Sequence, residues 1–351
     1  MAACDRWDGE LVLGSGWGKP GNLAGLTPVG IDPGAHPAAG AWRRRSGDRP
    51  AGGNDAAEQA LMGWLAGLIA ALAWTLASSL WRGLATSLTA LQLNGLKNGI
   101  ACLLLLPVLL TLPWMHQPAS LVLLLLSGGV GIALGDSFYL AALRRLGTRR
   151  TLTVESLAPI AAAIGGVVGL GEHLPHQAWI GAGLVTVSVL VVARQAPPEA
   201  TVQRDQSATS QRLGLICAVL AVLCGVSGAA LSRSVLINSD LTPLQSAATR
   251  LLGGLVLLLP WLRFNTPWAR PRPRRARWPR VLLATLLGTN LGIVLQQVVL
   301  QRLPLGLGVT LLSTAPVMAL LVARAEGDQP RLGGVLASLL AVVGVGLAVL
   351  S

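Results

Sequence analysis

Charged residues are scarce in this sequence: Asp, Glu, Lys and Arg make up 12% of its 351 residues, against about 25% in an ordinary soluble domain. Apolar residues account for 52%, and the mean hydropathy is +0.61. This shortage of charge excludes an ordinary soluble domain and indicates a membrane protein. The apolar runs also lack the alternation typical of strands. We therefore expect helices, because backbone groups in lipid must be paired within each helix.

Residues that bind metals or perform nucleophilic catalysis are also few. The four cysteines have no partner at metal-ligand spacing, and the four histidines lie in the N-terminal tail or between apolar runs. No pair of acids at metal-binding spacing occurs inside an apolar run. A membrane-embedded enzyme needs such groups at one depth, so we expect no catalytic residue, no metal site and no cofactor.

Long apolar runs recur along the chain and are sufficient to cross roughly 30 Å of hydrocarbon at about 1.5 Å per residue. We expect ten transmembrane helices, at residues 62–81, 91–112, 119–143, 151–170, 176–194, 212–232, 243–262, 280–301, 306–324 and 331–350.

Part of the sequence is an internal repeat: residues 131–159 align without a gap with residues 288–316, and ten of the 29 positions are identical. A duplicated membrane segment with Gly and Pro at equivalent positions is typical of secondary transporters whose binding site lies between the copies. The identical pairs are Gly131/Gly288, Leu134/Leu291, Gly135/Gly292, Leu143/Leu300, Arg145/Arg302, Leu146/Leu303, Thr153/Thr310, Ser156/Ser313, Ala158/Ala315 and Pro159/Pro316.

Weaker matches, Arg82/Arg233 and Lys97/Arg250, extend the duplication to the other helices. We therefore divide the chain into repeats at 62–195 and 212–351, joined by a polar linker at 196–211. Each repeat has five helices, and since five is odd, the second copy must enter the bilayer upside down if both fold alike. The predicted fold is an all-α integral membrane protein with ten transmembrane helices in two inverted-topology five-helix repeats.

The N-terminal tail, residues 1–61, is rich in Gly, Pro, Ala and Arg and has no sustained apolar run, so we expect disorder there. It lacks the features of a secretory signal. Met62 stands immediately before the first expected helix, and two interpretations stay open: the tail is translated, or the chain begins at Met62.

Loop arginines fall almost entirely on one face. The loops after the odd-numbered helices hold nearly all of them, and the opposite loops hold only Arg233 and Arg302. The positive-inside rule then places the first face in the cytoplasm and both termini outside. Because these arginines lie in short loops rather than on a soluble domain, the net charge of +12 predicts no nucleic-acid partner.

The duplicated region carries recognisable motifs. The first copy reads Gly-Asp-Ser-Phe-Tyr-Leu-Ala-Ala-Leu at 135–143 and Ser-Leu-Ala-Pro at 156–159, followed by Gly171-Glu172. The second reads Leu-Gln-Gln at 295–297 and Thr-Leu-Leu-Ser-Thr-Ala-Pro at 310–316, followed by Glu326. In these segments, and over about residues 62–351, the chain resembles the EamA type of the drug/metabolite transporter superfamily.

The resemblance implies ten helices, a central cavity lined by helices 1 to 4 and 6 to 9, and peripheral helices 5 and 10. It also implies transport of small metabolites or drugs. The sequence departs from the family pattern in two places. The segment from Pro316 to Glu326 is nearly one helical turn shorter than that from Pro159 to Glu172. Members are also commonly drawn with both termini in the cytoplasm, against the distribution of arginines.

Asp136 and Glu155 are the acids well inside the first repeat, and the second copy has apolar residues at both places. An ionisable group in a membrane helix is costly unless paired or hydrated. In one interpretation a carboxylate binds a coupling proton or a cationic substrate group. In the other the acids pair with Lys97, Arg82 or a nearby arginine and hold helices together.

Tyr139 and Gln296 occupy equivalent positions in the two copies, and Tyr139 is the one tyrosine of the chain. A phenol within the membrane needs a polar partner. The pair is a candidate for the wall of a cavity, and hydrogen bonding between helices is the alternative.

The remaining candidates are the Ser-to-Pro segments and two cations. Ser156 and Ser313 precede Pro159 and Pro316 by three residues, where proline frees a backbone carbonyl, so we expect kinked helices that line the cavity or are satisfied by neighbouring helices. Lys97 and Arg250 are candidates to bind a substrate carboxylate or phosphate. Their alternative role is to extend toward the membrane surface from near the helix ends.

These features predict a secondary active transporter of a small polar metabolite, for example an amino acid exporter, driven by a proton gradient or by exchange. A drug efflux carrier is the first alternative, and a channel or a membrane enzyme ranks lower. The small multidrug mechanism places a Glu in the first helix, and neither the first nor the sixth helix contains an acid. We expect a multi-pass protein of the bacterial inner membrane.

Overall fold

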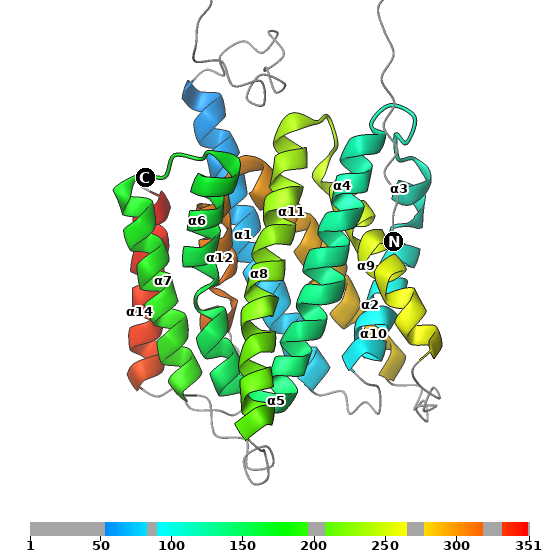
Figure 1. Cartoon of the computed structure of the whole chain (residues 1–351). Coiled ribbons are helices and arrows are strands. Elements are labelled where there is room, and N and C mark those ends of the chain that lie inside the picture. The colour runs from blue at the N-terminus through cyan, green and yellow to red at the C-terminus, as the bar shows by residue number, and fades with distance from the viewer. Residues whose placement is uncertain (1–52, 83–89, 196–207, 265–276, 319–331, 350–351) are drawn as a thin grey trace, which may run out of the picture. The chain divides into compact units, whose positions relative to one another are not determined.

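Helices make up nearly all of the residues that the computed structural model describes, which are 53–82, 90–195, 208–264, 277–318 and 332–349 (Figure 1). The first half contains α1 (Gly53–Arg82), α2 (Ala90–Leu104), α3 (Leu106–Leu110), α4 (Pro118–Gly128), the π-helix η1 (Gly129–Gly135), α5 (Asp136–Glu155), α6 (Ala158–Leu170) and α7 (His176–Gln195). The second half contains α8 (Ala208–Asn238), α9 (Pro243–Phe264), α10 (Arg277–Ala284), the π-helix η2 (Thr285–Leu291), α11 (Gly292–Arg302), α12 (Leu305–Leu312) and α14 (Leu332–Val349). No strand occurs within these ranges.

Within the described residues, six helical stretches are long and apolar enough to cross a membrane, and Leu305–Met318 and Gly333–Val349 are shorter apolar helices. Large apolar side chains remain exposed on the helices, as at Leu110, Val168 and Val342. Lipid is the solvent that suits such a surface. The chain is therefore a multi-pass helical membrane protein. The six stretches are Ala57–Trp81, Pro118–Leu146, Arg150–Leu170, His176–Arg194, Thr209–Asn238 and Trp278–Arg302.

Two predicted boundaries were wrong. Helix α1 begins at Gly53, so residues 53–61 are helical rather than disordered, because the Ala, Glu and Gln residues there favour a helix. The arginine-containing loop expected between residues 143 and 151 is also helical, since α5 runs from Asp136 to Glu155. No proline interrupts the backbone there, although the apolar stretches still end at Leu146 and restart at Arg150.

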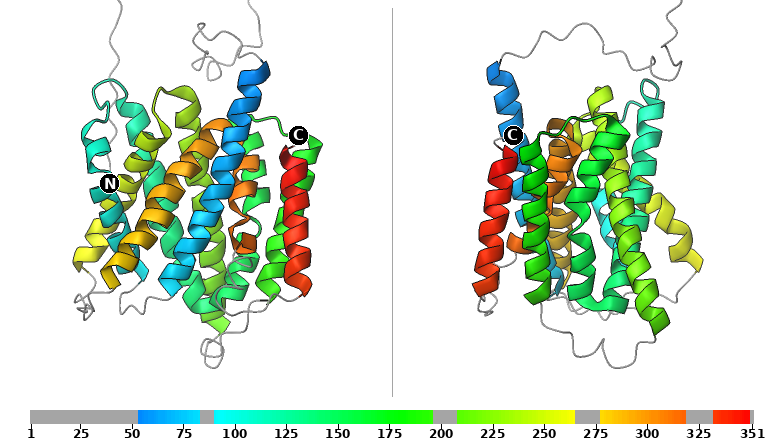
Figure 2. Two further views of the ribbon diagram at one scale, coloured as in Figure 1. Left: turned by 180° about the vertical axis from the view of Figure 1, so that it is seen from behind. Right: turned by 60° about the vertical axis from the view of Figure 1, so that its left-hand side comes forward.

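The two halves pack reciprocally. In the first half, α1 lies alongside α11 and η2 of the second half; conversely, α8 of the second half lies alongside α5 and η1 of the first (Figure 2). Helices α7 and α14 pair at one edge of the bundle. This pairing corresponds to the peripheral fifth and tenth helices that the family resemblance implied.

Helices α4 and α9 approach closely at a glycine. A Cβ atom placed on Gly128 would overlap the backbone carbonyl oxygen of Arg250. Small residues allow this kind of backbone approach between membrane helices. The contact holds the backbone of Arg250 against the end of α4, next to η1.

We expect Gly128→Ala to destabilise the protein by about 1–3 kcal/mol or more, because the added methyl group forces two backbones apart. The melting temperature of the purified protein in detergent measures the effect. Gly99→Ala is the matched control, since a Cβ at Gly99 meets no atom within 4 Å, and it should leave the melting temperature unchanged or raise it slightly, because alanine favours a helix more than glycine does. Equal melting of the two variants would contradict the packing argument.

Candidate substrate cavity

A cavity of about 340 Å³ lies between the two halves, within the usual size range of small-molecule sites. Side chains of α1, α5, α6 and α7 line it from the first half, and α8, α11 and α12 with the residues that follow α12 line it from the second. The wall residues are Trp74, Tyr139, Leu152, Glu155, Ala158, Val189, Ala221, Val222, Gly225, Val226, Ala229, Gln296, Val309, Leu312, Ser313, Ala315 and Pro316.

Most of this wall is aliphatic. Among the described wall residues, Glu155 carries the only formal charge, and Tyr139, Gln296 and Ser313 supply the other polar side chains apart from the indole of Trp74. The Trp74 Nε1–H donates to the carbonyl oxygen of Gly288 at 2.9 Å, which fixes the orientation of the ring. Two aromatic rings and one carboxylate thus occupy an otherwise apolar space.

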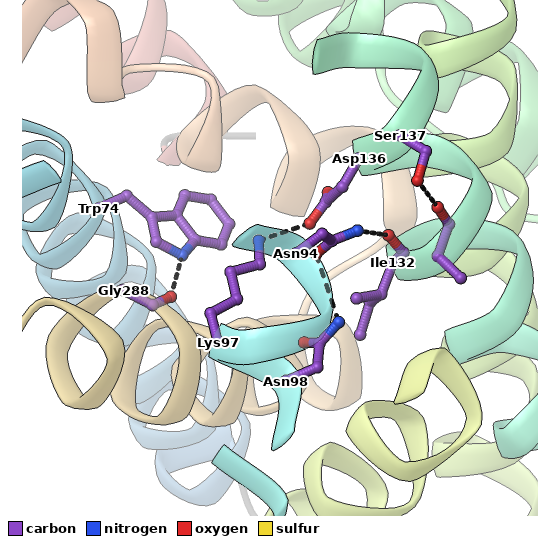
Figure 3. A network of polar contacts seen from close by, with 9 residues as sticks. Trp74, Asn94, Lys97, Asn98, Ile132, Asp136, Ser137 and Gly288 are labelled. Carbon is purple, nitrogen blue, oxygen red and sulfur yellow. Dashed lines mark hydrogen bonds and ion pairs between the residues drawn. The ribbon is translucent and has the colours of Figure 1, made fainter. Parts of the chain in front are cut away.

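The two π-helices stand at equivalent places in the duplicated sequence, directly before α5 and α11, which both contribute to the cavity wall. A π-turn is rare, disturbs the regular helical ladder and is frequent at functional sites. Side chains from other helices cap carbonyls within both: Asn94 Nδ2 donates to Ile132 in η1 at 3.2 Å, and Trp74 donates to Gly288 in η2 (Figure 3). A side chain of α2 thus holds η1 within the first half, and a side chain of α1 holds η2 across the two halves.

Lys97 and Asp136 form an ion pair. Lys97 extends from α2 so that its Nζ lies 2.6 Å from Oδ2 of Asp136 at the start of α5 (Figure 3). The two side chains are 25% and 38% exposed and are absent from the cavity wall. The structure supports the second interpretation of Asp136: the carboxylate pairs with Lys97, and the pair joins α2 to α5.

Arg250 is enclosed by protein, with 3% of its surface exposed. Its Nη1 donates to Oε1 of Gln296 at 3.2 Å, and its Nε has no hydrogen-bond partner among the described residues. A Cβ on Gly131 would lie 3.3 Å from Nη2, so the guanidinium rests on η1. Of the two roles considered for Arg250, extension toward the membrane surface is therefore wrong. Gln296 separates it from the cavity.

The two Ser-to-Pro segments have different roles. In the first, Ser156 donates to the carbonyl of Thr153 at 2.7 Å and is 2% exposed, and Pro159 is buried. In the second, Ser313 and Pro316 line the cavity. Both helices break as expected, since α5 ends at Glu155 and α12 at Leu312. The symmetric cavity role predicted for both pairs is thus seen only for the second.

The sequence profile of the EamA-like transporter family matches residues 61–194 and again 212–350. The chain belongs to the EamA-like transporter family. The prediction of an EamA protein with two repeats is therefore confirmed. Members of this family are transporters rather than enzymes.

No curated protein sequence matches the chain significantly. A solved structure described as "Crystal structure of protein" is similar in fold, with a TM-score of 0.65 and 20% identity, over 82% of this chain and 96% of that one. This likeness concerns the fold alone.

One ion pair in this EamA protein, between Glu172 and Arg233, was not among the residues predicted to form the site. Gly171 ends α6 in the left-handed conformation, with φ at 65°, which is common for a glycine at the end of a helix. Glu172 accepts a hydrogen bond from Nε of Arg233 and another from the backbone N–H of Leu305 at 2.8 Å. Arg233 Nη1 also donates to the carbonyl of Leu300 at 2.6 Å. The group joins the α6–α7 turn to α8, α11 and α12, and we call it the Glu172–Arg233 latch.

A signal for the latch was present in the duplication, because Arg233 and Glu172 each have a counterpart in the other copy, at Arg82 and Glu326. Trp74 and Thr75 had no such signal. Thr75 Oγ1 contacts the carbonyl oxygens of Ala71 and Ala315, each at 2.9 Å. This hydroxyl therefore joins α1 to the segment that follows α12.

Proposed function

We propose that the protein is a secondary active transporter that carries a small substrate through this cavity by alternating access. The observation that carries the proposal is one cavity with walls from both repeats, in a bundle that has π-helices at equivalent places of the two repeats. Transporter sites of this kind form at repeat interfaces from distorted helices. The partners are a small molecule, membrane lipid, and a proton or an exchanged substrate.

The proposed architecture is ten transmembrane helices in two five-helix repeats of opposite orientation. The reciprocal packing supports it: α1 contacts α11 and η2, as α8 contacts α5 and η1. Exchange of the halves preserves these neighbours, as a two-fold axis in the membrane plane requires. Two related halves facing opposite compartments then supply one gate each.

The Glu172–Arg233 latch is the proposed gate on one side. Its side chains are 9% and 11% exposed, and Arg233 lies one turn of α8 beyond Ala229 on the cavity wall. The sequence counterparts Arg82 and Glu326 are the candidates for the opposite gate; their side chains lie outside the described residues. Breaking of the latch would expose the cavity to its side of the membrane.

A polar metabolite and a drug-like molecule remain two candidate substrates. The aliphatic wall favours a molecule with an apolar body, which supports the drug carrier as the second candidate. Glu155 is the candidate group for a coupling proton. We also propose the bacterial inner membrane as the location.

Cysteine labelling tests alternating access without knowledge of the substrate. The starting protein has all four native cysteines replaced: Cys4, Cys102, Cys217 and Cys224. One cysteine is then introduced, either as Ser313→Cys in the cavity wall or as Ser188→Cys. The native Ser188 hydroxyl is buried between α7 and α14. In proteoliposomes, we expect an impermeant thiol reagent to label position 313 from either side, and position 188 from neither. Labelling of 313 from one side only, under all substrate and pH conditions, would argue against a carrier.

A further inference from the structure

The charge pattern of the cavity identifies a substrate class. We propose that the cavity binds an organic monocation: an amine or quaternary ammonium group on a compact apolar or aromatic body. The inference rests on the proposed transport function and goes beyond it by naming what is carried. Its starting point is Glu155, the one formally charged side chain on the described wall.

Three cations within the helical bundle are engaged elsewhere. Lys97 is paired with Asp136, and Arg233 with Glu172. Arg250 donates to Gln296 and lies behind it. Among the described residues no side chain forms a salt bridge with Glu155. A carboxylate in a largely apolar space is stable only with a counter-charge or a proton, so a cationic ligand supplies what the wall lacks.

The aromatic residues support the same class. Trp74 and Tyr139 both line the cavity, and the bond from Trp74 to Gly288 keeps its indole N–H away from a ligand and leaves the ring as its contact surface. An ammonium group over an aromatic face gains about 0.5–2 kcal/mol, more when both are desolvated. The aliphatic remainder, such as Val222 and Val309, suits an apolar body.

Gln296 refines the specificity. Arg250 donates to its Oε1, so the amide N–H₂ is the group that Gln296 offers to a ligand. It would favour a hydroxyl, ether or carbonyl oxygen on the substrate. No cation stands on the described wall to neutralise a carboxylate or phosphate, and Glu155 would repel one. The structure therefore disfavours the sequence-based hypothesis that Lys97 or Arg250 binds a substrate anion directly.

Four small molecules with a shared phenylethyl body separate the charge classes: phenethylamine, 2-phenylethanol, 3-phenylpropionate and phenylalanine. Binding to the full-length protein in nanodiscs is measured by competition with radiolabelled phenethylamine at neutral pH. We expect the amine to bind at least about tenfold more tightly than the alcohol, equivalent to about 1.4 kcal/mol. The anion should not compete, and the zwitterion should compete weakly.

The variants assign this preference to Glu155. Glu155→Gln should equalise amine and alcohol, and Glu155→Asp should retain part of the preference, which guards against a merely misfolded variant. Glu58→Gln, at an exposed position near the start of α1, is the matched control and should match the wild type. Equal binding of amine and alcohol by the wild type, or an unchanged preference in Glu155→Gln, would overturn the proposal.

The labelling and binding experiments together separate this inference from the transport function. If binding is selective for the amine but the Ser313→Cys variant is labelled from one side only, the proposed substrate class is supported and the proposed carrier function is contradicted. Labelling from both sides, together with tighter binding of 3-phenylpropionate or phenylalanine, retains the carrier and removes the substrate class.

Discussion

Glu155→Gln is expected to lower counterflow of labelled phenethylamine in proteoliposomes by at least about 100-fold, which corresponds to about 2.8 kcal/mol. The amide keeps the size of the side chain but removes the one negative charge on the described cavity wall. A cation would then enter an apolar space without a counter-charge. Counterflow at saturating substrate and the half-saturating concentration should both be measured, because the loss is expected chiefly in binding.

Asp136→Asn should behave differently. It leaves Lys97 without its counterion and should lower the folded yield and the melting temperature, since the pair is only partly exposed. The folded fraction should still prefer the amine over the alcohol. If Asp136→Asn removes that preference while Glu155→Gln preserves it, the Lys97–Asp136 pair is the binding site, and our assignment of the carboxylate is wrong.

Arg233→Met is expected to destabilise the protein by about 3–5 kcal/mol, the usual consequence of removing one partner of a buried ion pair. Glu172 would keep its hydrogen bond from Leu305 but lose its counter-charge. The melting temperature and the folded yield in detergent report the loss.

The double variant Glu172→Gln with Arg233→Met separates stability from gating. It removes both charges and keeps an acceptor for the N–H of Leu305, so most of the lost stability should return. The gate should stay weakened. When Ser313→Cys is added to the double variant, the thiol reagent should label position 313 faster than it does with the latch intact, from the side on which the α6–α7 turn lies. Wild-type labelling rates in the stable double variant would show that the latch is structural only.

Several features of the fold were readable in advance because they depend on local composition. Long apolar runs predict membrane helices, and the duplicated Gly, Ser and Pro positions predict two related halves with broken helices. The boundaries at Gly53 and within α5 were misplaced, since hydropathy reports contact with lipid and not the extent of helical backbone. A helix continues beyond the apolar run wherever the following residues favour helical backbone and no proline interrupts it.

The candidate site was predictable only in part. Tyr139, Glu155, Gln296, Ser313 and Pro316 meet on the cavity wall. The other candidates lie outside it: Lys97 and Asp136 neutralise each other, Arg250 lies behind Gln296, Ser156 bonds to its own helix, and Pro159 is buried. Polar residues are rare in membrane helices, and this rarity identified the candidate residues. It could not predict which side chains or backbone groups each candidate contacts.

The amino-acid sequence by itself determined the class of this protein: a helical membrane transporter of the EamA family, made of two copies of one unit, since hydropathy, repeat and motif are properties of the chain. Only the tertiary structure decided which charges are already neutralised and which one faces the cavity. The partners Lys97 and Asp136, Glu172 and Arg233, and Trp74 and Gly288 come from helices distant in the chain. The packing of those helices leaves Glu155 on the cavity wall without a cationic partner among the described residues.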